Sequence, residues 1–338
     1  MAGHPDLRPS PPMLAAFFRS NQPAVLVSVP LVVAALFVPA CWHAPVQNAS
    51  LMPVASLMQH LVGGSAWANA LAGMVLVALA TVQLAILVNA LELMDRRNHL
   101  VALTFPVLLA GLCGPGCYDP ALLGLPFVLF ALRRAWSISN TGAALAALFD
   151  AALLIGLAAL CYLPYAVLLV VLWISTSLIR PFAWREYVLP VISVVLVFCI
   201  AWMALHLAGR TPWRPLLTVM PDDMAPAVLW QGLSRKAFLV IAMPILLLAL
   251  AAFYRSQAQS VMRGRNLRSA FMALALSLAV LMGLLSWLKG SFPAVLAASP
   301  IGGIAAYLFL NPKRRWLAEL GLGAMLCAAL WVRWGGGM

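Results

Sequence analysis

Long runs of apolar residues, separated by short polar segments, dominate the pattern along this chain. A helix that crosses the hydrocarbon core of a bilayer needs about 20 apolar residues. Most runs come close to that length, at 23–41, 66–91, 142–163, 187–207, 236–253, 266–288, 292–310 and 316–332. Two shorter runs, 100–113 and 120–132, are joined by the turn sequence GPGCYDP, and a third, 165–179, follows Pro164. The pattern predicts an all-α transmembrane bundle of about 11 segments, or about 9 if the hairpin at 100–132 re-enters the membrane without crossing it.

The basic residues predict how this bundle is oriented, because Lys and Arg concentrate in short cytoplasmic loops. Every second loop carries most of them: Arg8, Arg19, Arg96, Arg97, Arg133, Arg134, Arg180, Arg185, Arg255, Arg263, Arg265, Arg268, Lys313, Arg314 and Arg315. We therefore expect a cytoplasmic N-terminus and an outer C-terminus. The expected layout is a cytoplasmic tail at 1–22, a single bundle at 23–333 with an outer loop at 209–235, and a short tail at 334–338.

Composition supports the membrane interpretation and excludes several other classes of protein. Hydrophobic residues make up 64% of the 338 residues and charged residues only 9%, which is too little polar surface for a soluble domain. The net charge of +12 would suggest nucleic-acid binding in a soluble protein, but here the basic residues lie in short loops as topology signals. We expect no nucleic-acid partner. No Cys-x-x-Cys pair occurs, so we expect no metal site, and no motif indicates a cofactor.

Asp150 is the strongest candidate for chemistry inside the membrane. It lies within the apolar stretch ALFDAALLIG and has no basic residue three or four positions away, unlike Glu92 and Glu319. An ionisable group at membrane depth is costly, and so points to a functional site such as that of a proton-coupled transporter. The alternative is a structural hydrogen bond to a neighbouring helix.

The outer loop at 209–235 and the helix before it contain a second set of candidate residues: His206, Arg210, Arg214, Asp222 and Asp223. Arginines bind phosphate through paired hydrogen bonds, and paired acids can hold a cation or exchange protons. Together they could accept the diphosphate of a polyprenyl-linked sugar at the outer face. The alternative is a solvated loop of mixed charge.

A charged stretch between two apolar runs, SLIRPFAWREYVLP at 177–190, is the third candidate. Its arginines orient the chain, Pro181 can end the incoming helix, and Glu186 can begin the next one. As an alternative to this role as a turn, Arg180 and Arg185 could clamp a phosphate headgroup beside Trp184 and Glu186.

The longer segment from Leu148 to Pro190 that contains this stretch, together with MLAAFFRSNQP at 13–23 and NALELMDRRNHLVALTFPVLLAG from Asn89, resembles an uncharacterised family of multi-pass inner-membrane proteins of Bacteroidota. The RPF-x-WRE motif, from Arg180 to Glu186, carries most of the resemblance. The resemblance covers roughly the first 200 residues, and the last third of the chain is similar to the family only in hydropathy. The resemblance implies a bacterial inner-membrane location and a chain that starts near Met13.

Three hypotheses about function follow. The first is a protein of cell-envelope biogenesis that binds or moves a polyprenyl-phosphate-linked or other anionic lipid. The second is a proton-coupled small-molecule transporter centred on Asp150, and the third is a non-catalytic assembly factor with a protein partner. An enzyme is less expected, because the outer loop that we expect at 42–65 lacks the acids that polyprenyl-sugar glycosyltransferases usually carry in their first outer loop. A carotene oxygenase label carried by some relatives is excluded, because such oxygenases are soluble propellers with four histidines at the iron.

Overall fold

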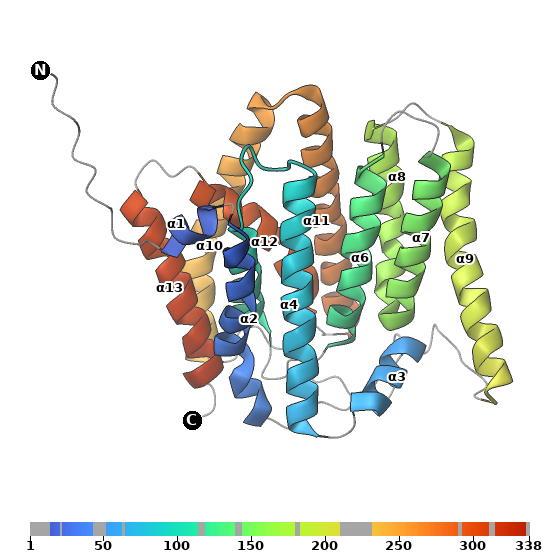
Figure 1. Cartoon of the computed structure of the whole chain (residues 1–338), viewed down its shortest axis with the longest axis horizontal. Coiled ribbons are helices and arrows are strands. Elements are labelled where there is room, and N and C mark those ends of the chain that lie inside the picture. The colour runs from blue at the N-terminus through green and yellow to red at the C-terminus, as the bar shows by residue number, and fades with distance from the viewer. Residues whose placement is uncertain are drawn as a thin grey trace, which may run out of the picture.

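The computed structural model describes residues 14–20, 22–42, 52–62, 65–113, 119–138, 144–179, 183–209, 232–289, 293–310 and 315–335, and within these ranges every regular element is a helix (Figure 1). The elements are α1 (Leu14–Arg19), α2 (Pro23–Phe37), η1 (Val38–Trp42), α3 (Pro53–Val62), α4 (Ala66–Ala90), α5 (Val101–Leu112), α6 (Pro120–Trp136), α7 (Ala144–Cys161), η2 (Leu163–Val167), α8 (Leu168–Ile179), α9 (Trp184–Leu207), α10 (Leu233–Gln259), α11 (Met262–Lys289), α12 (Ala294–Leu310) and α13 (Arg315–Trp334). The all-α prediction is confirmed.

Seven of these helical stretches are long and apolar enough to cross a membrane: Ala24–Trp42, Ala66–Ala90, Ala144–Cys161, Trp184–Leu207, Leu233–Gln259, Met262–Trp287 and Trp316–Trp334. Shorter apolar helices occupy Val101–Leu112, Leu163–Ile179 and Ala294–Leu310. The protein is therefore a multi-pass membrane protein, as predicted. The number of about 11 segments and the orientation of the termini stay predictions.

The long helices run side by side and alternate in direction between two ends of the bundle (Figure 1). One end, here called the Arg268 end, contains the loop at 91–100 and the turn from α10 to α11. The opposite end, here called the Asp119 end, contains the start of α6 and the last turn of α13. Trp334 at the Asp119 end donates a hydrogen bond of 3.1 Å to the carbonyl of Ala35, which joins α13 to α2.

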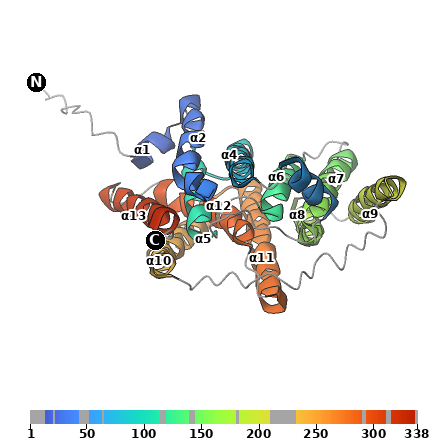
Figure 2. The same ribbon diagram turned by 90° about the horizontal axis from the view of Figure 1, so that it is seen from below.

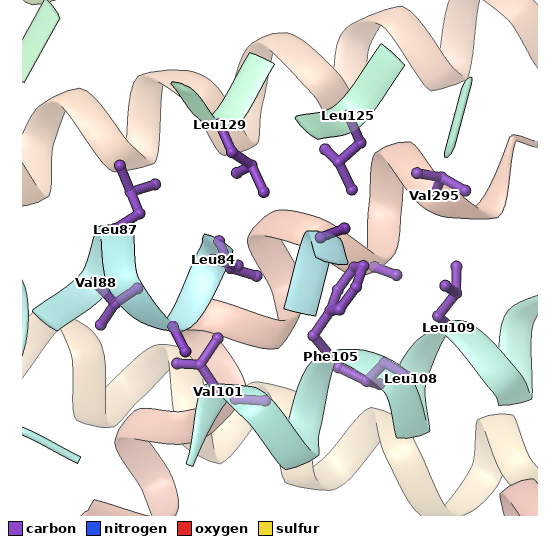
Figure 3. Packing of buried hydrophobic residues seen from close by; sticks show 14 of the residues in the cluster. Leu84, Leu87, Val88, Val101, Phe105, Leu108, Leu109, Leu125, Leu129 and Val295 are labelled. Carbon is purple, nitrogen blue, oxygen red and sulfur yellow. The ribbon is translucent and has the colours of Figure 1, made fainter. Parts of the chain in front are cut away.

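The short helices α5 and α12 form the centre of the bundle (Figure 2). The hydroxyl of Thr104 donates a 2.8 Å hydrogen bond to the carbonyl of Gly302, and a Cβ at Gly302 would lie 2.9 Å from the Cα of Phe105. Figure 3 shows Phe105 and its α5 neighbours facing side chains of α4, α6 and α12. Because protein surrounds α5, its 12 residues do not have to match the thickness of the hydrocarbon core.

Helix α9 lies at the opposite extreme, at the edge of the bundle (Figures 1 and 2). It packs on α7, where a Cβ at Gly156 would lie 3.0 Å from Val197. On its outer side large apolar residues are exposed, among them Ile192, Ile200 and Trp202. In a membrane protein such a surface faces lipid, which explains how the chain tolerates so much exposed apolar area.

Two parts of the structure differ from the expected layout. The segment at 42–65 was expected as a loop, but it contains the amphipathic helix α3, whose Ala55 packs on Leu123 and Cys161 while Leu57 and Leu61 are exposed. Figure 1 shows α3 at the Asp119 end.

The second difference concerns the expected tail at 1–22, because residues 14–20 are helical and packed on the bundle. Both carboxylate oxygens of Glu319 accept from the backbone N–H of Ala15, at 3.1 and 3.0 Å. The side chain of Arg19 donates a 2.8 Å hydrogen bond to the carbonyl of Phe309. Phe18 of the same helix is also buried. Helix α1 therefore belongs to the packed structure at the Arg268 end.

Candidate anion-binding site at the Arg268 end

A buried arginine fixes the loop between α4 and α5 to the rest of the bundle. Arg268 of α11 donates from Nε to the carbonyl of Leu93 at 2.8 Å and from Nη1 to the carbonyl of Ser256 at 2.6 Å. Its Nη2 lies 2.7 Å from Oδ1 of Asp95. The hydroxyl of Tyr307 in α12 also donates to the carbonyl of Leu93. One guanidinium thus joins the loop to α10 and α11, and Tyr307 adds α12.

The loop is also held by its own hydrogen bonds. The side chain of Asn89 donates to the carbonyl of Asn98 at 2.8 Å and accepts from the Asn98 backbone N–H at 3.1 Å. The side chain of Asn98 in turn accepts from the backbone N–H of Leu100 at 3.1 Å. Glu92 adopts a left-handed backbone conformation with φ of 51°, where the chain leaves α4. The conformation of residues 91–100 is therefore specified by many polar contacts.

Exposed arginines flank the residues that form this network. Arg96 and Arg97 follow Asp95, Arg255 precedes Ser256, and Arg263 and Arg265 precede Arg268 by one to two turns. We call these five residues the basic corner. The nearby acids are Asp95, which is held by Arg268, and Glu92 on the same loop. The basic corner thus places five exposed arginines next to residues whose backbone is fixed by hydrogen bonds.

Apolar side chains are exposed beside the basic corner. Tyr254 is 54% exposed, and Val261 and Met262, in the turn between α10 and α11, are 79% and 82% exposed. Apolar residues at such a turn are stable where headgroups meet acyl chains. A ligand at the basic corner would therefore meet both positive charge and an apolar surface, the combination that suits a lipid headgroup.

The charged motif predicted from sequence lies close to the basic corner. Asn266, which follows Arg265, donates a 2.9 Å hydrogen bond to the carbonyl of Leu178 near the end of α8. Leu178 precedes Arg180 by two residues, and Arg180 itself lies outside the described residues. The structure thus brings the approach to the RPF-x-WRE motif to the start of α11, a proximity that the sequence did not reveal.

The described part of that motif begins α9. Trp184 is 62% exposed, and the guanidinium of Arg185 lies 5.7 Å from the centre of its ring, as in a cation–π contact. Glu186 is buried in the first turn of the helix, where the helix dipole stabilises a negative charge. An arginine beside an exposed tryptophan is compatible with headgroup binding, but also with a structural role at the interface.

Asp150 has a basic partner that the sequence analysis did not predict. Nε and Nη2 of Arg134 lie 3.1 and 2.9 Å from Oδ2 of Asp150. The partners are 16 residues apart, and they meet because α6 and α7 form a hairpin. The two side chains are 52% and 46% exposed. Asp150 therefore belongs to an ion pair near the start of α7.

The outer-loop candidates Arg210, Arg214, Asp222 and Asp223 lie outside the described residues. His206, the remaining member of that set, is exposed in the last turn of α9. Its ring stacks on Trp202 with centroids 5.6 Å apart. The structure thus places His206 at the Asp119 end, against an aromatic side chain of its own helix.

His99 is a buried polar residue of the Arg268 end that the sequence analysis passed over. Its backbone N–H donates a 2.8 Å hydrogen bond to the carbonyl of Phe18, so α1 lies against it. The Nδ1 atom has no hydrogen-bond partner among the described residues, and burial lowers the pKa of the imidazole. His99 is therefore favoured in its neutral form.

The sequence matches no family model and no curated protein. Its fold is similar to part of a mutant of the arabinofuranosyltransferase AftD from Mycobacteria, with a TM-score of 0.51 and 21% identity. That similarity covers 92% of this chain but 25% of AftD, so the chain spans about a quarter of that protein's length. A second structure, the oligosaccharyltransferase of Archaeoglobus fulgidus, has a TM-score of 0.48 and 14% identity, over 91% of this chain and 52% of that one. The AftD similarity shows a shared membrane fold.

Proposed function

We propose that the protein binds an anionic, phosphate-bearing lipid of the cell envelope at the basic corner. The observation that carries this proposal is the gathering of exposed arginines around a loop that Arg268 holds in place. Arginine binds phosphate oxygens through paired hydrogen bonds, and a fixed backbone lowers the entropy that binding costs. Polyprenyl-phosphate-linked lipids are the class that we favour.

Electrostatics alone gives this surface a useful affinity. A Lys or Arg near an anionic membrane surface contributes about 1 kcal/mol. Several arginines that act together would retain a headgroup, while the lipid tail remains in the surrounding bilayer. The exposed Val261 and Met262 add contact at the depth where the tail begins. The arginines then contact the headgroup of the lipid, and the apolar residues contact the start of its tail.

We propose that the Arg268 end faces the cytoplasm of a bacterium, with the protein in the inner membrane. All five arginines of the basic corner belong to this end, as do Arg133 and Arg134, and positive loops stay in the cytoplasm. The resemblance carried by the RPF-x-WRE stretch supports the inner-membrane location, and the fold shared with AftD, an arabinofuranosyltransferase, supports a role in envelope biogenesis. Transfer of a sugar is no part of the proposal.

The alternative of a proton-coupled transporter centred on Asp150 loses its original support. It was based on an isolated acid, whereas Asp150 pairs with Arg134 and is half exposed. An assembly factor remains compatible with every contact described, but none of these contacts favours it. Lipid binding is the hypothesis that uses the geometry of the Arg268 end.

Purification in mild detergent, followed by mass spectrometry of co-purified lipids, tests the proposal. The wild type is expected to retain an anionic phospholipid or polyprenyl-phosphate lipid. The double variant Arg263→Gln, Arg265→Gln is expected to lose most of it. Arg133→Gln is the matched control, because it removes an exposed charge at the same end outside the basic corner. Equal lipid content in all three proteins would refute the proposal.

A further inference from the structure

Side chains from several helices also converge at the Asp119 end, where none of the proposed lipid-binding arginines lies. Cys113 ends α5, Asp119 begins α6, and Tyr162 follows α7. Arg235 lies in the first turn of α10 and Arg333 in the last turn of α13. Helices α10 and α13 both pack on α5, so that their ends at Arg235 and Arg333 lie by the end of α5 at Cys113, and Tyr162 packs on Tyr165, whose hydroxyl donates to the carbonyl of Ala121 near Asp119. These residues therefore form one cluster.

Packing between α5 and α10 brings Arg235 into this cluster. The ring of Phe238 lies directly on Gly111, where an added Cβ would come within 2.2 Å of it. Arg235 is one helical turn before Phe238, and Cys113 is two residues after Gly111. The absence of a side chain at Gly111 thus allows the close approach that places a cation beside the end of α5.

Packing between α10 and α13 brings the second cation to the same end. The two helices are antiparallel, and a Cβ at Gly321 would lie 3.7 Å from the side chain of Ile245. At 1.5 Å per residue, Arg333 lies about 18 Å along α13 from Gly321, and Arg235 lies about 15 Å along α10 from Ile245. Both distances run toward the Asp119 end, so the two arginines reach similar depths. Arg333 is buried, with its guanidinium 4.5 Å from the centre of the Phe37 ring.

Asp119 is the one acidic side chain among the described residues at this end. Its Oδ1 accepts a 2.9 Å hydrogen bond from the backbone N–H of Ala121, whose carbonyl accepts from the hydroxyl of Tyr165 at 2.7 Å. Burial raises the pKa of Asp119 and so disfavours its negative charge. With Arg235 and Arg333 both cationic, the cluster favours an anionic ligand.

Exposed tryptophans place this end at the depth of lipid headgroups. Trp42 and Trp334 are 63% and 52% exposed, with ring centroids 6.0 Å apart, and Trp67 is 56% exposed at the start of α4. Exposed tryptophans concentrate where the membrane meets water. An anion at Arg235 would therefore meet the headgroup layer of the leaflet at this end, which favours a lipid over a soluble phosphate.

We infer that Arg235 and Arg333 form a second binding site for the phosphate of an anionic lipid headgroup, at the end opposite the basic corner. The inference goes beyond the proposed function, because it assigns a site in the other leaflet. The protein then receives the same class of headgroup from both faces of the membrane. Arg235 is the more accessible cation, and Arg333 supplies a buried charge behind it.

Native mass spectrometry with added polyprenyl phosphate, in a detergent that preserves the fold, can count the bound lipids. The wild type is expected to bind two, one at each end. Arg235→Gln is expected to bind one, and Arg235→Lys to bind the second lipid at least severalfold more weakly, because lysine loses the paired geometry. Lys236→Gln is the matched control, since it removes the neighbouring exposed charge and should still bind two. Neutral polyprenol tests binding of the lipid tail without the phosphate, and inorganic phosphate tests binding of the anion without the tail.

The outcomes separate this inference from the proposed function. If Arg235→Gln binds as many lipids as Lys236→Gln, the second site does not exist, whatever occurs at the basic corner. The double variant Arg263→Gln, Arg265→Gln is expected to retain one lipid. If adding Arg235→Gln to this double variant removes that lipid, the second site exists independently of the first. Equal binding of polyprenol and polyprenyl phosphate at this end would overturn the inference. Displacement by inorganic phosphate alone would show a soluble anion site and would also overturn it.

Discussion

The guanidinium of Arg268 lies 2.7 Å from the carboxylate of Asp95, and the arginine is buried whereas the aspartate is half exposed. Two backbone carbonyls, those of Leu93 and Ser256, complete the shell of the arginine. A buried charge is stable only when such partners satisfy it. The position of the loop at 91–100, and with it the basic corner, depends on this one side chain.

Replacing Arg268 with glutamine is therefore expected to destabilise the protein. The substitution leaves the carbonyls of Leu93 and Ser256 without the guanidinium donor, and a buried carbonyl left unsatisfied costs about 1 to 3 kcal/mol in the free energy of unfolding. Arg265→Gln, one turn earlier and exposed, should change it by less than about 0.5 kcal/mol. Denaturant titration of both variants in detergent provides the comparison. Equal stability of the two variants would show that the network around Arg268 does not hold the loop.

The second prediction concerns Gly302, where α12 packs closely on α5. A methyl group there would lie 2.9 Å from the Cα of Phe105, and because this Cα belongs to the backbone, the two helices must move apart. Gly302→Ala should cost about 1 to 3 kcal/mol in the free energy of unfolding. Gly323→Ala, in α13 with no atom within 4 Å, should be neutral or stabilise the helix by up to about 1 kcal/mol. Thermal unfolding that ranks the two variants in the reverse order would contradict this account of the core.

The ion pair between Arg134 and Asp150 distinguishes lipid binding from proton-coupled transport. Because both side chains are half exposed, Asp150→Asn should lower the free energy of unfolding by less than about 1 kcal/mol. It should also leave the content of co-purified lipid unchanged. A transporter centred on Asp150 requires the opposite, namely that this variant folds and inserts but loses activity in the cell. A growth or envelope phenotype of Asp150→Asn equal to that of a deletion strain would favour transport.

His99 makes stability depend on pH. Burial lowers the pKa of its imidazole below the usual histidine value of about 6.5, so the unfolded chain binds a proton more readily than the folded chain. The stabilisation is complete above about pH 6.5 and is lost as the pH falls through that value toward the lower pKa of the folded state.

Thermal unfolding between about pH 7.5 and 5.5 should therefore show a falling midpoint for the wild type. His99→Gln should flatten this dependence, whereas His206→Gln, at an exposed position in α9, should retain it. An unchanged slope in His99→Gln would mean that other groups produce the pH dependence.

The apolar pattern predicted the helices closely, because a membrane span is encoded by its own residues. The run at 66–91 became α4, and the run at 292–310 became α12. Helix α3 was missed because its 10 residues are too few for a span, and its helical character depends on packing over α6 and α7. The amphipathic spacing of Leu57 and Leu61 was the available signal.

The candidate sites were harder to predict, because their geometry arises from contacts between distant segments. Arg268 and Arg265 look alike in sequence as topology signals, yet one is buried in a network and the other is exposed. The partner of Asp150 is 16 residues away and became visible only with the hairpin. Cys113 and Arg235 belong to helix ends that meet through Gly111 and Phe238, a contact that no local pattern contains.

The most direct test of phosphate-lipid binding at the basic corner is to measure, for the purified protein, the affinities for polyprenyl phosphate and for neutral polyprenol at low and high salt. We predict that the phosphate form binds at least about tenfold more tightly at low salt, which corresponds to 1.4 kcal/mol. High salt should reduce this preference, and so should Arg263→Gln, Arg265→Gln, but not Arg133→Gln. Equal affinities for the two lipids at every salt concentration would contradict the proposed function.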